Sequence, residues 1–113
     1  MASKKKSEIL GDHKYEIIDL EDYADIPVGS YVILEGVVEG KPEMLNTPSR
    51  RPGRWQFVGY YVNTVFALGD FKVRYEGAAF IRKGDNVVVW GRKGHDFLDA
   101  KQIETDYFVV KID

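Results

Sequence analysis

The residues with the clearest chemistry lie between positions 50 and 57, where the sequence reads Arg-Arg-Pro-Gly-Arg-Trp-Gln-Phe. Guanidinium groups pair with phosphates and stack on flat rings. Aromatic side chains on a sheet stack on the bases of single-stranded nucleic acid without reading its sequence. The pattern predicts a nucleic-acid contact made by Arg50, Arg51, Arg54, Trp55 and Phe57. The alternative is that both aromatic rings point into a core, while the arginines only keep the loop soluble.

Two further regions of the chain supply cations to the same predicted site. Lys72 and Arg74 alternate with apolar residues, so a strand would turn them away from the core. Arg92 and Lys93 lie in a glycine-containing turn, where basic residues also occur for solubility alone. Tyr61 is expected to face outward, because that register buries the larger apolar set, namely Tyr60, Phe66 and Leu68.

Catalytic and metal-binding motifs are missing from the sequence. It contains no H-E-x-x-H, Walker A, G-x-S-x-G or G-x-G-x-x-G pattern. It has no cysteine and two histidines, which argues against a zinc site. A cation held by His95, Asp96 and Asp99 is less expected than a solvent-exposed turn. We therefore expect a binding protein rather than an enzyme, with no metal and no cofactor.

Composition indicates one small soluble domain. The chain has 113 residues, of which 44% are hydrophobic and 13% aromatic, enough for a modest core. The absence of cysteine fits a cytoplasmic protein. No run of residues resembles a membrane helix or a signal peptide, so no membrane association is expected.

Charge is distributed unevenly along the chain, although the net charge is only −2. Residues 27–95 carry ten Lys/Arg against six acidic residues, whereas the segments on both sides carry an excess of acids. An acidic chain opposes tight nucleic-acid binding, but a basic middle permits a weaker interaction. The acidic ends could alternatively face a basic protein partner.

The elements that must position these residues are short strands separated by Gly- and Pro-containing turns, which is typical of a small barrel. Gly36 is expected at a bulge of the first strand. Residues 40–53 are expected to form a loop, and 77–81 a linker or helical turn. Residues 107–112 could form a sixth strand beside the N-terminal segment. The five strands expected are Tyr31–Glu39, Arg54–Leu68, Phe71–Tyr75, Asn86–Gly91 and Phe97–Ile103.

The stretch Phe80–Gly91 carries a resemblance to a known fold. Gly84, Asp85, Val87, Val89 and Gly91 match the phrase x-x-G-D-x-V-x-V-x-G, which commonly begins the fourth strand of nucleic-acid-binding oligonucleotide/oligosaccharide-binding (OB) folds. Over residues 28–105 the chain resembles that family. The resemblance implies a five-stranded Greek-key barrel with a possible extra terminal strand. It also implies a single-stranded DNA or RNA ligand on the outside of strands two and three.

The resemblance divides the chain into a flexible basic tail (1–7), an acidic N-terminal extension (8–27) and an OB-fold domain (28–113). It leaves a protein-interaction or assembly module as the alternative function, and it leaves the oligomeric state open. A fainter likeness is to the haem chaperone of cytochrome c maturation, through Val73, Tyr75 and Gly77. That family binds haem on a C-terminal His followed four residues later by Tyr, a pattern this chain lacks.

Overall fold

The fold is given by a computed structural model that describes residues 7–10, 13–50 and 57–111, with side chains described for 13–45 and 62–111. Among these residues no helix has the length and apolar character needed to cross a membrane. The elements are β1 (Ser7–Leu10), β2 (His13–Ile17), the 3₁₀ helix η1 (Leu20–Asp25), β3 (Tyr31–Arg50), β4 (Phe57–Leu68), β5 (Phe71–Tyr75), β6 (Asn86–Lys93), β7 (Leu98–Glu104) and β8 (Val109–Lys111).

Five strands close into a barrel in the order β3-β4-β5-β7-β6, and β6 returns to pair with β3. All neighbours are antiparallel except β5 and β7, which are parallel. The predicted all-β class with a five-stranded barrel is confirmed, and the arrangement is compatible with an OB-like barrel. The terminal strands are additions: β1 and β2 extend the sheet beside β3, and β8 pairs with β7. The expectation that the C-terminal strand pairs with the N-terminal segment is wrong.

Strand β3 closes the barrel because it pairs with two strands in turn. Residues 31–37 pair with β6, and the pairing with β4 starts at Val38. Gly36 therefore lies just before the switch of partners, and the bulge expected there is found further along, as a register shift between Glu39 and Glu43. Gly40 takes a φ of 78° there, a backbone conformation that glycine adopts without strain. Gly36 instead allows close packing, since a Cβ atom on it would lie 2.9 Å from Leu20 Cδ1.

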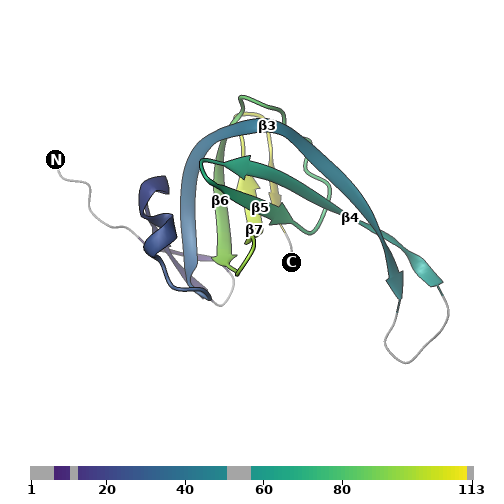
Figure 1. The fold of residues 1–113 in the computed structure, drawn as a ribbon, viewed down its shortest axis with the longest axis horizontal. Coiled ribbons are helices and arrows are strands. Elements are labelled where there is room, and N and C mark those ends of the chain that lie inside the picture. Colours follow the sequence, from purple (N-terminus) through teal and green to yellow (C-terminus); the bar gives the residue numbers. More distant parts are fainter. Residues whose placement is uncertain (1–6, 11–12, 51–56, 112–113) are drawn as a thin grey trace.

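Beyond the barrel, β3 and β4 continue together as a two-stranded arm. The expected loop over 40–53 is wrong as far as Arg50, because β3 remains paired with β4 up to the pair Arg50 and Phe57. The two prolines are tolerated because Pro42 lies in the register shift, while Pro48 lies where β3 has only one paired edge. The pairing of β4 with β5 ends at Thr64. The arm is therefore about 20 Å long at the usual rise per residue, and it projects on the side opposite η1 (Figure 1).

The barrel core follows the alternation of the strands. Val87 and Val89 are both buried on one side of β6, as predicted, and Phe66 and Leu68 point inward from β4, also as predicted. Because successive side chains of a strand point to opposite faces, these contacts fix which residues lie on the outside of the barrel. The other members of this core are chiefly aliphatic, among them Val32, Leu34, Val38, Val73, Leu98 and Ile103.

The connection between β5 and β6 fills one end of the barrel without forming a helix. Ala79 and Ile81 are buried, so this linker contributes to the core although no helical turn forms at 77–81. Thr64 holds it: its hydroxyl donates to the Gly77 carbonyl at 2.8 Å and accepts from the Ala79 amide at 3.0 Å. Both hydrogen-bonding roles of this buried hydroxyl are therefore satisfied.

The N-terminal segment packs against the barrel at two places. Tyr23 on η1 is buried in the main core and stacks on Phe71, with ring centroids 3.9 Å apart. Leu20 packs against the same core. β2 contributes Tyr15 to a second cluster on the outer face of the sheet, with Ile33 and Trp90. Residues 13–25 are thus part of the packed structure.

The phenol of Tyr23 should make stability depend on pH above neutrality. Burial raises its pKa from 10.0 to about 12, and the Asp99 carboxylate adds to the shift. Between these values the unfolded chain loses the phenol proton while the folded chain keeps it. The free energy of unfolding should therefore be unaffected by this group below pH 10.0 and fall above it, by up to about 1.4 kcal/mol per pH unit. Urea unfolding at about pH 9 and about pH 11 checks this. The Tyr23→Phe variant should lack this part of the decrease, and an equal decrease in both proteins would contradict the assignment.

Candidate functional site

The outer face of β4 and β5 carries the cations that the sequence assigned to the third strand. Lys72 and Arg74 are turned outward, as expected, and lie opposite Ala67 and Val65 in the register. Lys72 is exposed and Arg74 is half-buried, whereas Val73 between them is fully buried. The face is therefore partly apolar, with cations along its β5 side.

A carboxylate lies between two of the predicted arginines. Arg74 donates to Asp99 Oδ1 through Nη2 at 2.7 Å and through Nε at 3.2 Å. Its guanidinium group also lies over the Phe97 ring, 5.2 Å from the centroid. Arg92 is the register partner of Asp99 on the other side of β7 and is exposed. Arg74, Asp99 and Arg92 thus form one row across three strands, in which Asp99 offsets part of the positive charge.

Lys93 has a different environment from its neighbour Arg92, although the sequence assigned both to the ligand. Its ammonium donates to the carbonyls of Tyr23 and Ile26 at 2.7 Å each and of Ala24 at 3.3 Å. It also lies 4.5 Å from the centroid of the Tyr23 ring. A lysine near the end of a helix commonly hydrogen-bonds the last carbonyls in this way. Lys93 therefore fastens η1 to the end of the barrel.

Replacing Lys93 with Met should lower stability and leave ligand binding largely intact. The variant keeps most of the apolar side chain but loses charged hydrogen bonds to three carbonyls, so we expect the free energy of unfolding to fall by about 1–2 kcal/mol. Urea unfolding measures it. The matched control is Arg92→Met, which should change stability by less than about 0.5 kcal/mol because Arg92 is exposed. Equal stabilities of the two variants would contradict the fastening role.

The other predicted contact residues lie at the end of the arm. Arg50 ends β3 and Phe57 begins β4, and the two are paired. The side chains of Arg50, Phe57 and Tyr61 lie outside the described residues, as do Arg51, Arg54 and Trp55 entirely. The described part of the structure thus brings together Lys72, Arg74 and Arg92, and it separates Lys93 from them. One continuous positive surface that includes the arm remains a prediction.

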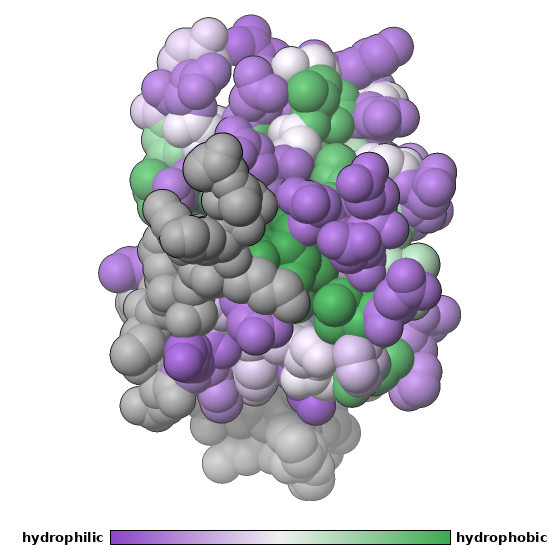
Figure 2. Space-filling model, turned by 90° about the vertical axis from the view of Figure 1, so that its left-hand side faces the viewer, coloured by the Kyte–Doolittle hydropathy of each residue, from purple (hydrophilic) through white to green (hydrophobic). Residues whose placement is uncertain are grey.

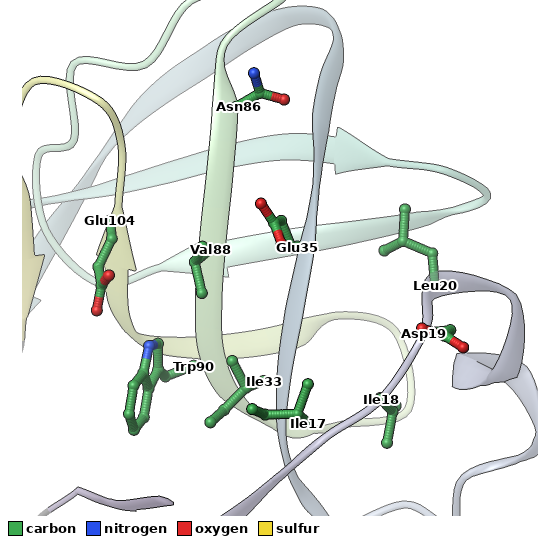
Figure 3. A pocket seen from close by; sticks show the side chains of 10 residues that line it. All are labelled: Ile17, Ile18, Asp19, Leu20, Ile33, Glu35, Asn86, Val88, Trp90 and Glu104. Carbon is green, nitrogen blue, oxygen red and sulfur yellow. The ribbon is translucent and has the colours of Figure 1, made fainter. Parts of the chain in front are cut away.

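A second feature, which the sequence analysis missed, is a groove of about 560 Å³ on the outside of β3 and β6. Hydrophobic side chains reach the surface on the side of the molecule that carries η1, among hydrophilic neighbours (Figure 2). The groove is seen from close by in Figure 3. Its lining residues are Ile17, Ile18, Asp19, Leu20, Ile33, Glu35, Asn86, Val88, Trp90 and Glu104.

The centre of the groove is built from two cross-strand rows. Val88 lies between Glu35 on β3 and Glu104 on β7, and the next row places Trp90 beside Ile33. Adjacent strands are about 4.8 Å apart, so the two glutamates begin about 10 Å apart across an apolar strip. The Glu104 carboxylate accepts a hydrogen bond of 2.7 Å from Gln102. The result is an apolar floor with a carboxylate on each side.

Trp90 adds an unusual polar group to this groove. The residue is 8% exposed, and its indole Nε1 is buried without a hydrogen-bond partner in the described structure. A buried donor without an acceptor costs about 1–3 kcal/mol of stability, so such groups are rare in folded proteins and call for an explanation. In Figure 3 this nitrogen is on the edge of the ring toward Glu104. The carboxylates do not suggest a metal, because no group of three potential metal ligands occurs within the described residues.

A sequence signal for the groove did exist in the strand that carries it. The run Val87-Val88-Val89-Trp90 is apolar at every position, whereas a barrel strand with one face in solvent should alternate. Val87 and Val89 fill the core, so Val88 and Trp90 must lie on the outside. An outer face with two large apolar side chains predicts that something covers it.

No known family model, curated protein or solved structure matches the chain.

Proposed function

We propose that the protein binds single-stranded nucleic acid without catalysis, as an OB-fold module. In that fold the ligand lies on the second and third strands and between the loops that join strands one to two and four to five. The corresponding parts are β4, β5, the arm and residues 94–97. Lys72, Arg74 and Arg92 would neutralise phosphates, and Trp55, Phe57 and Tyr61 would stack on bases.

The arm is the observation that carries this proposal. Its two strands run to Arg50 and Phe57, which are the first and last residues of the stretch with three arginines and two aromatic residues. A two-stranded ribbon is only marginally stable alone. Met44 and Leu45 on this arm leave 43% and 49% of their surface exposed. A nucleic-acid strand along the arm would cover apolar surface and neutralise its cations at once.

The experiment that tests the function is a titration with oligo(dT), followed by tryptophan fluorescence at several salt concentrations. Binding should quench the emission, and the logarithm of the affinity should fall linearly with the logarithm of salt, by about 0.7 per phosphate contact. With the cations of the arm, β5 and Arg92 engaged, the slope should lie between about −2 and −4. Absence of binding at low salt, or a slope near zero, would overturn the proposal.

Removing the Asp99 carboxylate should strengthen nucleic-acid binding. Asp99→Asn frees the Arg74 guanidinium from its ion pair and takes a negative charge out of the row that it shares with Arg92. The affinity for oligo(dT) should rise by about threefold to tenfold, and the salt slope should steepen by about 0.7. The control is Glu21→Gln, which removes an exposed carboxylate on η1. An equal rise in both variants, or a decrease in Asp99→Asn, would mean that this row does not contact the ligand.

A further inference from the structure

The groove on the outside of β3 and β6 suits a different kind of ligand from the nucleic acid proposed for the arm. We propose that it binds an extended, basic segment of a partner polypeptide, with a Lys or Arg side chain between Glu35 and Glu104. This inference does not rest on nucleic-acid binding, because it uses other residues and charges of the opposite sign.

The negative charge of the groove favours a cationic ligand. Asp19, Glu35 and Glu104 line it, and none of its lining residues in the described structure is a cation. Glu35 and Glu104 stand on both sides of Val88, so a cationic group lying on Val88 would reach both carboxylates (Figure 3). A phosphate chain would be repelled by the same groups. The surface is therefore complementary to positive charge.

The apolar floor distinguishes a long basic side chain from a small cation. Lys and Arg lay their methylene stems on apolar surface while the charged head stays with polar groups. Ile33 and Val88 offer that surface directly beside the carboxylates. Within the described residues no set of side chains is arranged to hold a metal ion. The groove thus suits an amphipathic cation better than a bare one.

Trp90 indicates that the ligand is a polypeptide. Its indole N–H is a donor only, and it is buried without an acceptor in the described structure. The residue is more than nine-tenths buried and lines the groove. A peptide backbone supplies carbonyl acceptors next to its basic side chains, whereas a simple polyamine supplies none. One short peptide segment can therefore satisfy the carboxylates and the indole together.

The test uses the full chain with Trp55→Phe, which leaves Trp90 as its only tryptophan and as the reporter of the groove. The probe is a blocked hexapeptide of alternating Lys and Ala, titrated at low salt. We expect the emission of Trp90 to change on binding. Glu35→Gln and Glu104→Gln, each made separately, should weaken the affinity by about tenfold, the effect of one charged hydrogen bond. The matched control is Glu43→Gln, an exposed carboxylate on the same strand as Glu35, which should bind like the parent.

Three results would overturn the inference: no binding of the lysine peptide at low salt, an equal loss in Glu43→Gln, or equal binding of spermidine or of a Glu-Ala peptide. The oligo(dT) titration of the tryptophan-containing chain separates this site from the nucleic-acid face. Glu35→Gln should bind oligo(dT) like the parent chain if the groove is independent. Failure of nucleic-acid binding would leave the peptide result unaffected.

Discussion

Replacing Arg50, Arg51 and Arg54 together with Gln should weaken the binding of oligo(dT) by about 100-fold at about 50 mM salt. The variant removes up to three phosphate contacts, so the salt slope should also become shallower by about 2. The measurement is the fluorescence titration repeated at four salt concentrations. This is the largest effect that the proposed function predicts, because three cations and two aromatic residues fall within eight positions there.

A matched variant separates local contacts from the general effect of net charge. Lys14, Lys83 and Lys111 are exposed and belong to neither the β4–β5 face nor the arm. Changing them to Gln alters the net charge equally but should weaken binding by less than about threefold through long-range attraction. Equal losses in the two triple variants would show that the protein attracts nucleic acid only by overall charge.

Replacing Tyr23 with Ala should destabilise the whole barrel by about 3–4 kcal/mol, the usual cost of removing a large buried ring. Tyr23 belongs to the 3₁₀ helix near the N-terminus, yet its ring stacks on Phe71 and lies against the Lys93 ammonium. The substitution therefore removes contacts that join η1, β5 and β6. Urea unfolding followed by circular dichroism gives the free energy.

Tyr107→Ala is the control for this substitution, because Tyr107 leaves 75% of its surface exposed. It should change the free energy of unfolding by less than about 0.5 kcal/mol. A small effect of Tyr23→Ala, equal to that of Tyr107→Ala, would mean that residues before 27 are a separable extension. A large effect means that the barrel needs η1 to close its core.

Local alternation was enough to predict the strands of the barrel. Phe71 to Tyr75 shows the period of two that a half-buried strand requires, and Asn86 to Gly91 is rich in β-branched residues between turn signals; both form strands in the structure. The arm was not predictable in this way, because Lys41-Pro42 and Pro48 are typical of loops. Pairing along a single edge, which only the fold provides, lets β3 continue through both prolines.

The candidate sites were predictable only in part, because some of their contacts also depend on the fold and not on the local sequence. The outward direction of Lys72 and Arg74 follows from the alternation of β5 alone. The contacts of Lys93 with η1 join residues about seventy positions apart, so no local pattern reports them. The groove needs side chains from four strands (β2, β3, β6 and β7) and from the segment after β2, and only the unbroken apolar run before Gly91 indicated it in the sequence.

The small net charge of the chain reflects two surfaces of opposite charge. Lys72 and Arg74 lie on β5 and the described part of β3 ends at Arg50, whereas the groove beside η1 carries carboxylates, and the arm projects away from η1 (Figure 1). A protein arranged in this way could hold a nucleic-acid strand on one side and a basic polypeptide on the other. Because opposite charges lie on different surfaces, neither ligand needs to displace the other.

The indole N–H signals of the two tryptophans give the most direct test of nucleic-acid binding at the arm and β5. Trp55 belongs to the proposed nucleic-acid site and Trp90 to the groove, so a ¹⁵N-labelled protein reports each surface by one resonance. Adding oligo(dT) should shift the Trp55 indole and the backbone amides of Lys72 and Arg74, and it should leave the Trp90 indole in place. A shift of the Trp90 indole with an unmoved Trp55 and β5 would contradict the account.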